Sequence, residues 1–351
     1  MKIEELLEVT IIEKASDLHL LVGLPPVLRI NGELFPITGK GDLDNESVKE
    51  LVFSLLTEEQ KEIVLVNKEL DFSFDYKGKG KFRVNVYHQK GTLAASFRLL
   101  PLTIPKIDEI NLPEICHQFT ELKQGFILVT GPTGHGKSTT LAAIIEEINQ
   151  TRPVHIVTIE DPIEYVFFPK KGIISQREIR SDTHSWQIAL RSCLREDPDV
   201  VMVGEMRDYE TISSALTIAE TGHLVFATLH TNSAAQTVDR IIDVFPENQQ
   251  EQVRMQLSNT LEAILSERLL PSLEGGRIPA FEILVATPAV RTAVREGKTH
   301  LIDNIIQTSV ELGMKTLEMD LARLVRQGKI SLDIAKMYAQ RPEELMRLIK
   351  K

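Results

Sequence analysis

The nonapeptide GPTGHGKST, from Gly131 to Thr139, sets the architecture of the chain. The apolar run before it, Gly125 to Thr130, has β-branched members and is short enough to predict a buried strand. After it, Thr140 to Ile148 carries apolar side chains at helical spacing. Glycine and proline break regular structure between these two segments. A strand, a glycine-rich loop and a helix in this order are the context that the pattern G-x-x-x-x-G-K-[ST] requires.

The residue types of this loop predict a phosphate-binding site. Without side chains at Gly134 and Gly136, successive backbone N–H groups can point inward around a phosphate chain, and the helix N-terminus adds further donors. Lys137 would reach the β- and γ-phosphates, and the hydroxyl of Ser138 would bind Mg²⁺. We therefore expect a nucleoside triphosphate, ATP, with Mg²⁺ to be bound by Gly131, Pro132, Thr133, Gly134, His135, Gly136, Lys137, Ser138 and Thr139.

Composition and charge narrow the class of protein. The chain has 351 residues, enough for two domains, and its 42% hydrophobic and 26% charged residues are ordinary for a soluble protein. A formal net charge of -10 argues against a surface that coats nucleic acid. The two cysteines, Cys116 and Cys193, exclude a tetracysteine zinc module. The acidic N-terminus is unlike a signal peptide and no apolar run approaches about 20 residues, so we expect a cytoplasmic protein without membrane insertion.

The first hundred residues predict an α+β domain with a mostly antiparallel sheet. Helices are expected at residues 3–15, 45–56 and 58–65, and strands at residues 18–22, 27–30, 33–37, 71–76, 82–87 and 92–100. The pair Asn31-Gly32 is typical of a two-residue hairpin turn. Prolines at positions 101, 105 and 113 indicate a linker, so we expect the domain boundary there.

After the loop, acidic residues follow a predicted strand at residues 155–159. Glu160, Asp161 and Glu164 stand at its carboxyl end, beside the expected phosphate site. Carboxylates in that position can polarise water or hold Mg²⁺ through water. The alternative is a charged turn made rigid by Pro162.

A second strand, residues 200–203, delivers Gly204 and Glu205 to the same edge. ATPases with this loop usually have an aspartate where Gly204 stands, so Glu205 is predicted to be the general base or the residue that orients the attacking water. A structural role for Glu205 is the alternative. His230 follows the next strand, residues 223–229, and is either a phosphate sensor or a satisfied polar residue.

Four arginines each have two interpretations. Arg83 and Arg98 lie in predicted strands before the linker, and they either cover a solvated face or reach a bound nucleotide. Arg195 and Arg240 either act as fingers on the γ-phosphate of a neighbouring subunit or form surface ion pairs.

Five segments together resemble one family. They are ASDLHL (residues 15–20), GLPPVLRINGEL (23–34), TIEDPIEYV (158–166), LREDPDVVMVGEMRD (194–208) and HLVFATLHTNSAAQTVDRIIDVFP (223–246). Nearly end to end, the chain resembles the bacterial type IV pilus retraction ATPases, the twitching-motility motors of the secretion-ATPase superfamily.

This resemblance implies an α/β fold and a hexameric ring of two-domain subunits, with the nucleotide between the domains. Residues 1–100 would form an N-terminal PAS-like α+β domain, residues 101–112 a linker and residues 113–270 a RecA-like P-loop ATPase core. Residues 271–351 would form a mostly helical C-terminal region.

The resemblance also assigns residues. It places the family's acidic box at Glu160, Asp161 and Glu164, its catalytic glutamate at Glu205, its histidine box at His223 and His230, and its nucleotide-contacting arginines at Arg83, Arg98, Arg195 and Arg240. Residues 289–296, AVRTAVRE, resemble the retraction motif AIRNLIRE and keep both of its arginines, Arg291 and Arg295. From the pattern alone, that segment is an ordinary amphipathic helix.

The expected function is therefore that of an ATP-hydrolysing homohexameric motor for type IV pilus retraction and disassembly. It would work at the inner face of the cytoplasmic membrane on a membrane-embedded pilus platform protein, without nucleic acid. An accessory retraction paralogue is one alternative, and a pilus extension or type II secretion ATPase is another, although these carry a tetracysteine zinc element. A ring ATPase that translocates nucleic acid is the alternative from a different class, and DNA-stimulated turnover would distinguish it.

Overall fold

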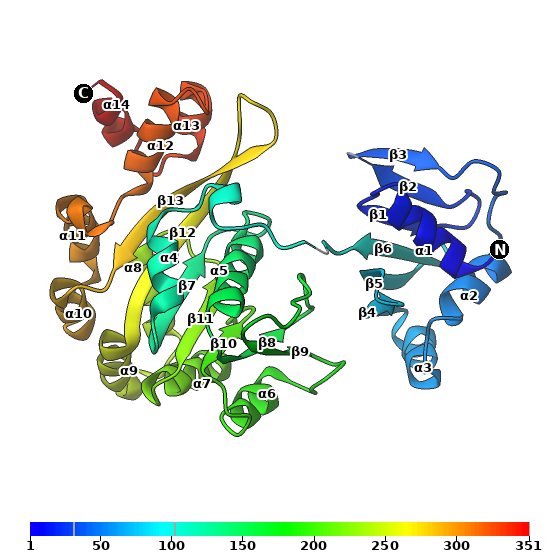
Figure 1. Ribbon diagram of the computed structural model, residues 1–351, viewed down its shortest axis with the longest axis horizontal. Helices are drawn as coiled ribbons and strands as arrows, with labels where there is room; N and C mark the ends of the chain where they lie inside the picture. Colours follow the sequence, from blue (N-terminus) through cyan, green and yellow to red (C-terminus); the bar gives the residue numbers. More distant parts are fainter. Residues whose placement is uncertain (31, 102, 351) are drawn as a thin grey trace. The chain divides into compact units, whose positions relative to one another are not determined.

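The computed structural model describes residues 1–30, 32–101 and 103–350, and the chain folds into two compact units (Figure 1). The first unit comprises residues 1–103 together with 162–166, and the second comprises residues 104–161 and 167–351. Each unit has its own sheet and its own apolar core. Within the described ranges, no helix has both the length and the apolar character needed to cross a membrane.

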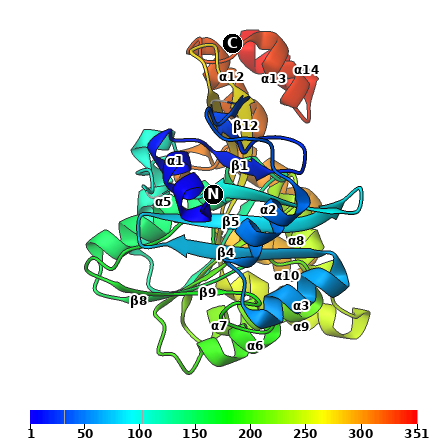
Figure 2. The same cartoon turned by 90° about the vertical axis from the view of Figure 1, so that its right-hand side faces the viewer.

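The first unit is built on a six-stranded antiparallel sheet (Figure 2). Its strands are β1 (Asp17–Leu20), β2 (Val27–Ile30), β3 (Glu33–Pro36), β4 (Glu69–Tyr76), β5 (Gly80–Gln89) and β6 (Thr92–Leu99). They are ordered β3-β2-β1-β6-β5-β4, and every neighbouring pair is antiparallel. The predicted antiparallel sheet is therefore confirmed, while Asn31 of the predicted turn lies outside the described residues.

Three helices complete this unit: α1 (Ile3–Ile12), α2 (Asn45–Phe53) and α3 (Glu58–Asn67). Helix α1 buries Ile3, Leu6 and Leu7, which share one face at helical spacing. Helix α2 begins after Asp44, whose side chain accepts a hydrogen bond from the third residue on, and α3 begins after Thr57 with a capping box. These caps fix the helix starts close to where the sequence predicted them.

The second unit is built on a seven-stranded, mostly parallel sheet. Its strands are β7 (Gly125–Thr130), β8 (His155–Glu160), β9 (Ile173–Glu178), β10 (Val200–Val203), β11 (Leu224–Leu229), β12 (Leu261–Pro271) and β13 (Arg277–Val285). The order is β13-β12-β7-β11-β10-β8-β9, and only the pair β12–β13 is antiparallel. Strands β7, β10 and β11 are buried along their whole length, which explains their continuous apolar runs.

Helices pack around this sheet, and those that lie between parallel strands in the sequence supply crossovers. They are α4 (Ile115–Glu121), α5 (Lys137–Thr151), α6 (Trp186–Cys193), α7 (Tyr209–Glu220), α8 (Ala234–Asp243), α9 (Glu247–Thr260), α10 (Pro288–Arg295), α11 (Ile302–Thr308), α12 (Leu317–Arg326), α13 (Leu332–Tyr338) and α14 (Pro342–Lys350), with short 3-10 turns η1 (Asp108–Ile110), η2 (Thr299–Leu301) and η3 (Val310–Leu312). One core joins the sheet to α6–α11. A smaller core joins the far end of the β12–β13 hairpin to α12–α14. The expected α/β fold is confirmed.

Three strands of the second unit, β9, β12 and β13, were not predicted from the sequence. Strand β9 was not predicted because it lies at the sheet edge and its residues, IISQRE, are mostly half-buried rather than alternating. Strand β13 lies in the region expected to be mostly helical, and it pairs with β12 from Ala263 to Pro271. A boundary after residue 270 would cut this hairpin, so the sheet of the second unit extends to Val285.

Candidate nucleotide-binding site

The loop between β7 and α5 has the backbone that its glycine pattern predicts. Gly131, Gly134 and Gly136 have φ angles of +145°, +78° and +99°, at which a β-carbon strains the backbone. A β-carbon at Gly131 would also lie 2.4 Å from the carbonyl oxygen of Glu267, and one at Gly136 would lie 2.3 Å from Oε1 of the same residue. These glycines therefore allow both the curvature of the loop and the close approach of β12.

Lys137 is folded over the loop. Its side chain is largely buried, with the residue 8% exposed, and Nζ donates to the carbonyl oxygens of Gly131 at 2.9 Å and Pro132 at 3.0 Å. Both acceptors are neutral, so phosphate oxygens can replace them with stronger charge-assisted hydrogen bonds. Ser138 follows in the first turn of α5 and is half-buried.

The donor set fits Mg²⁺ held mainly by phosphate. In the described part of the chain, no group of three or more His, Cys, Asp and Glu side chains could hold a metal ion by itself. Mg²⁺ is usually bound by one or two protein oxygens together with phosphates and waters rather than by a protein cage. The hydroxyl of Ser138, at the start of the helix that follows the loop, is the protein oxygen suited to that role.

Other strands hold the loop from the side. The Nδ1 of His135 accepts a hydrogen bond from the backbone N–H of Leu269 at 3.0 Å, and an Arg277 nitrogen donates to the carbonyl oxygen of Gly134 at 3.3 Å. Burial, together with nearby cationic groups, lowers the pKa of His135. The neutral imidazole that results is the form able to accept this bond. Thr133 lies 3.4 Å from His230, measured from Oγ1 to Nδ1.

The carboxyl ends of β8, β10 and β11 meet at one edge. Val203 of β10 is level with Ile159 of β8 and Ala227 of β11, so the residues that follow these strands lie together. Nε2 of His230 lies 2.7 Å from Oε1 of Glu205. The structure thus brings together the two residues that the sequence expected at one edge of the sheet.

Glu205 has a further partner that the sequence analysis missed. Nε of Arg207 donates to Oε1 at 2.6 Å and an Arg207 terminal nitrogen donates to Oε2 at 2.7 Å. Burial alone raises the pKa of Glu205, but the bonds from Arg207 and the charge of His230 outweigh burial and hold the pKa below its ordinary value. Because a carboxylate with a lowered pKa accepts a proton less readily, this arrangement favours orienting a water molecule over abstracting its proton.

The predicted acidic box is divided. Glu160 is buried at the end of β8, where its Oε1 accepts from Thr158 at 2.7 Å and from Gln176 at 3.2 Å. Asp161 is exposed next to it, whereas Glu164 is exposed within residues 162–166, which group with the first unit. Glu160 also limits the size of the residue that follows β10, because a β-carbon at Gly204 would lie only 3.3 Å from the Cα of Glu160.

His223 does not lie with His230. The two residues flank the six-residue strand β11, which separates them by roughly 20 Å. Nδ1 of His223 lies 3.1 Å from the carbonyl oxygen of Ile218 and 3.1 Å from Oγ1 of Thr221, at the end of α7. The structure therefore places only one histidine of the implied histidine box beside Glu205.

The four arginines are scattered. Arg195 is exposed in the turn after α6, and Arg240 is exposed on α8. Arg83 and Arg98 are directly paired on β5 and β6 of the first unit. Nε of Arg98 donates to Oδ1 of the buried Asp17 at 2.9 Å, so Arg98 has an ion-pair partner within its own unit.

Two charged residues of β12 were also missed. Glu267 and Arg268 are 2% and 7% exposed, although they stand in the middle of an apolar strand. Oε2 of Glu267 accepts from Oγ1 of Thr140 at 2.7 Å, and a terminal nitrogen of Arg268 donates to both oxygens of Asn232 at 2.9 Å. The signal available in the sequence was the pair of adjacent charges within the run LEAILSERLL, a pattern that an ordinary buried strand avoids.

The two arginines of the helix that resembles the retraction motif, Arg291 and Arg295, have different surroundings. The guanidinium of Arg291 donates to the carbonyl oxygens of Ser258 at 2.9 Å and Asn259 at 3.0 Å, and to Glu262 at 2.8 Å. It therefore ties α10 to the end of α9. Arg295 is exposed, and its guanidinium donates to Oγ1 of Thr292 at 3.3 Å.

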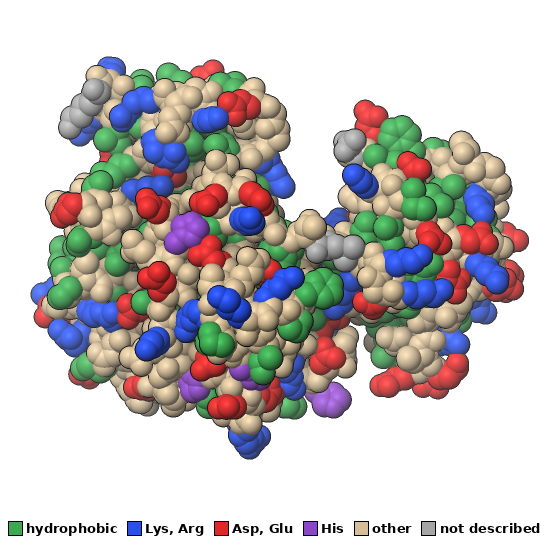
Figure 3. Space-filling model, in the orientation of Figure 1, with side chains coloured by type: hydrophobic (Ala, Val, Ile, Leu, Met, Phe, Trp, Pro, Cys, Tyr) green, Lys and Arg blue, Asp and Glu red, His purple; other side chains and the backbone are tan. Residues whose placement is uncertain are grey.

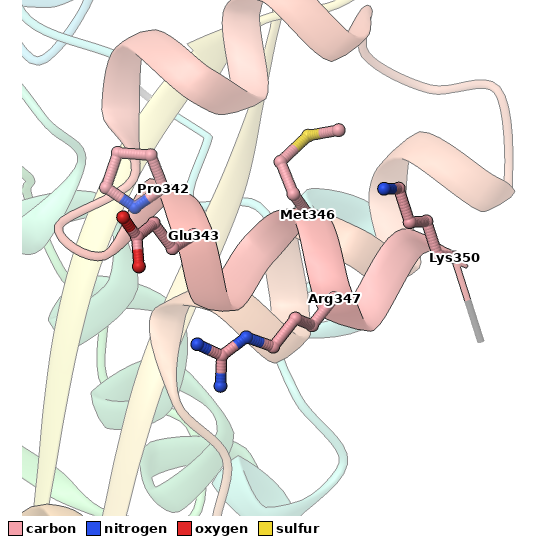
Figure 4. A pocket seen from close by; sticks show the side chains of 5 residues that line it. All are labelled: Pro342, Glu343, Met346, Arg347 and Lys350. Atoms are coloured by element: carbon pink, nitrogen blue, oxygen red, sulfur yellow. The ribbon is translucent and has the colours of Figure 1, made fainter.

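Two surface pockets lie elsewhere in the second unit. One, of about 620 Å³, is lined mainly by α10 and α11 and includes Thr292 and Ile305. The other, of about 380 Å³, lies along α14 and is lined by Pro342, Glu343, Met346, Arg347 and Lys350 (Figure 4). Neither is lined by the loop, so the nucleotide site is defined by its donors and not by these pockets.

Known proteins resemble the chain along almost its whole length. Residues 106–275 match the family described as Type II/IV secretion system protein. The chain is 46% identical to "Type IV pilus retractation ATPase PilT" of Pseudomonas aeruginosa, over 98% of this chain and 99% of that protein. It is 38% identical to "Type IV pilus ATPase PilU" of the same organism, over 100% and 92% of the two chains. The solved structure "Crystal Structure of the Pilus Retraction Motor PilT and Bound ADP" matches with a TM-score of 0.93 and 47% identity, covering 99% of each chain.

Proposed function

We propose the function of this chain from a premise that its relatives establish: the chain belongs to the family of type IV pilus retraction ATPases. It is an ATPase, and its work is the retraction of type IV pili in twitching motility. The observation that carries this conclusion is the near full-length match to a retraction motor, combined with a complete phosphate loop beside the Glu205–His230 pair.

The site supports hydrolysis in the following way. The loop amides and Lys137 bind the β- and γ-phosphates of ATP. The solved structure of a related retraction motor carries ADP, which supports a nucleotide site in this chain. The hydroxyl of Ser138 would hold Mg²⁺ together with the phosphates, and the ion would neutralise charge on the transferred group. Glu205 orients the attacking water, and His230 holds Glu205 in place through the 2.7 Å contact. Arg207 contacts both oxygens of Glu205 and His230 also contacts Oε1, so Oε2 is the oxygen that keeps a lone pair for a water.

The assembly is a homohexamer at the inner face of the cytoplasmic membrane, where it acts on a pilus platform protein. The near full-length resemblance to a retraction motor supports this assignment. In that assembly Arg83, Arg98, Arg195 and Arg240 are the candidates for additional nucleotide contacts, with Arg98 the least available because of its bond to Asp17.

A role as an accessory retraction ATPase is the nearest alternative, because the chain also aligns over its full length with a PilU protein at 38% identity. Nucleic-acid translocation is disfavoured by the net charge of -10. On the face of the second unit that Figure 3 shows, acidic and basic side chains are interspersed and do not form a basic track.

The test is pilus retraction in a strain that lacks only this gene. We expect retraction of fluorescently labelled pili to stop, to return with the unchanged gene, and not to return with Lys137→Ala. Normal retraction in the deletion strain would favour the accessory role. Loss of pilus assembly itself would favour an extension ATPase.

A further inference from the structure

One buried residue supports the phosphate loop at both ends. The backbone carbonyl of Glu267 lies against Gly131, and its carboxyl group lies against Gly136, so closely that a β-carbon at either glycine would clash. The same carboxyl accepts a hydrogen bond from Thr140 in the first turn of α5. Glu267 therefore contacts the start of the loop, its end and the helix that follows.

The groups around this carboxyl come from four places in the fold. Lys137 and Thr140 face it from α5, Cys116 from α4, and Arg268 is next to it on β12, with a guanidinium nitrogen 2.9 Å from the Glu267 carbonyl oxygen. His135 of the loop lies near Arg268 and Lys137. Glu267 itself is 2% exposed, so water does not screen its charge from these neighbours.

We propose that Glu267 is a positioning residue for nucleotide binding, which supports the phosphate loop through Gly136 and Thr140 and does so with an uncharged carboxyl group. This inference rests on the proposed function, because it takes the loop to be the ATP site. A negative charge at this position would oppose the phosphates directly. It would also compete with them for the ammonium of Lys137, the next residue after Gly136.

The titration of the surrounding groups supports an uncharged carboxyl at neutral pH. Burial raises the pKa of Glu267 to about 8, against the opposing effects of the Thr140 hydrogen bond and the charge of Lys137. Burial raises the pKa of Cys116 to about 12, and burial lowers the pKa of His135, so both stay neutral between pH 7 and pH 9. Of Glu267, Cys116 and His135, Glu267 is therefore the group whose charge changes in that range.

The direction of the pH effect follows from linkage. Since the uncharged form binds nucleotide better, affinity falls as pH rises through the pKa of Glu267, and bound nucleotide in turn raises that pKa. If the ionised form does not bind, the dissociation constant for ADP rises about tenfold between pH 7 and pH 9 for a pKa of about 8. The last ionisation of a phosphate, near pH 6, lies below this range and does not contribute.

The experiment is calorimetric titration of the full-length protein with MgADP between pH 7 and pH 9. We expect the wild type to lose about tenfold in affinity. Glu267→Gln, which keeps the shape of the uncharged carboxyl, should bind at pH 7 as the wild type does and show no loss at pH 9. Glu267→Ala should bind more weakly at every pH, because the loop loses its support. Thermal unfolding of each variant checks that it is folded, and the Gln variant alone carries the test if the Ala variant is not.

A matched control is available on the neighbouring strand. Glu282 of β13 is also 2% exposed, and burial raises its pKa to about 7, but its Oε1 accepts from the backbone of Ala234 and not from the loop. Glu282→Gln should therefore keep the pH dependence of the wild type. The proposal is overturned if Glu267→Gln keeps that dependence, or if it binds at pH 7 as weakly as Glu267→Ala. Absence of MgADP binding by the wild type at any pH would instead sink the proposed function.

Discussion

The phosphate loop and the strand beneath it, β12, contribute to one site but are encoded in different ways. The loop is a run of nine consecutive residues whose spacing predicts phosphate binding. Its support comes from Glu267, which bonds to Thr140 across 127 positions of sequence. The groups that we propose to bind phosphate are thus consecutive in sequence, whereas Glu267, which we propose to fix their geometry, is distant from them in sequence. Substitutions in the loop should remove contacts to phosphate, whereas substitutions in β12 should remove the support of the loop.

The largest effect is expected within the loop itself. Lys137→Ala removes the ammonium that bonds to the loop carbonyls and is available to the phosphates. Two charge-assisted hydrogen bonds are worth about 1.5–3 kcal/mol each, so ATP binding should weaken by about 10²-fold or more and turnover should be lost. Titration with MgATP and a phosphate-release assay measure the two effects. If turnover persists in this variant, the loop is not the hydrolytic site.

Substitutions at the carboxyl edge of the sheet should lower the rate of ATP hydrolysis without weakening nucleotide binding. Glu205→Ala should leave nucleotide affinity within a few-fold of wild type while lowering turnover by about 10²–10⁴-fold, because Glu205 acts on the water and not on the phosphates. His230→Ala, which removes the 2.7 Å contact to Glu205, should give a smaller loss of the same kind. Turnover at the wild-type rate in Glu205→Ala would show that another group handles the water.

A pair of glycines tests directly whether β12 restrains the loop. Gly136→Ala places a methyl group 2.3 Å from Oε1 of Glu267, whereas at Gly134 nothing lies within 4 Å. Both positions have positive φ, so both substitutions cost about 1 kcal/mol of backbone strain, and Gly136→Ala should cost a further 1–3 kcal/mol by overpacking. Chemical denaturation without nucleotide measures the difference.

The control for this pair is a double variant. Glu267→Ala opens space beside residue 136, so Gly136→Ala should cost less in that background than in the wild type. Equal costs for Gly134→Ala and Gly136→Ala in the wild-type background would mean that the loop does not rest on β12, whereas costs that become similar only beside Glu267→Ala are the expected result.

The contrast between residues that are consecutive in the sequence and residues that are distant in it also explains how much of the molecule the sequence predicted. Strand β7, the loop and helix α5 were predicted because their signals are consecutive, and Glu205 and His230 were expected at one edge because parallel strands end together. Glu267 was missed because its burial depends on residues that pack over it from distant parts of the sequence. Arg207 was missed although it is two residues from Glu205, since a turn decides whether such a pair meets. The separation of His223 from His230 follows from the length of strand β11, which lies between them and was itself predicted from the sequence.

The smallest effect on stability is expected in helix α10. The sequence motif contains Arg291 and Arg295 alike, but in the structure Arg291 is bonded to neighbouring groups and Arg295 is exposed. Arg291→Ala would leave the carbonyl oxygens of Ser258 and Asn259 and the carboxylate of Glu262 without this donor, at the end of α9. That should cost about 1–2 kcal/mol of stability. Arg295 is exposed, and Arg295→Ala should change stability by less than about 0.5 kcal/mol. Denaturation midpoints compare the two variants, with Lys298→Ala as an exposed control.

Pilus retraction distinguishes two roles for the motif. If Arg295→Ala stops retraction while stability and ATP turnover stay unchanged, this exposed arginine acts on something outside its own chain. If only Arg291→Ala stops retraction, the motif acts through the packing of α10 on α9.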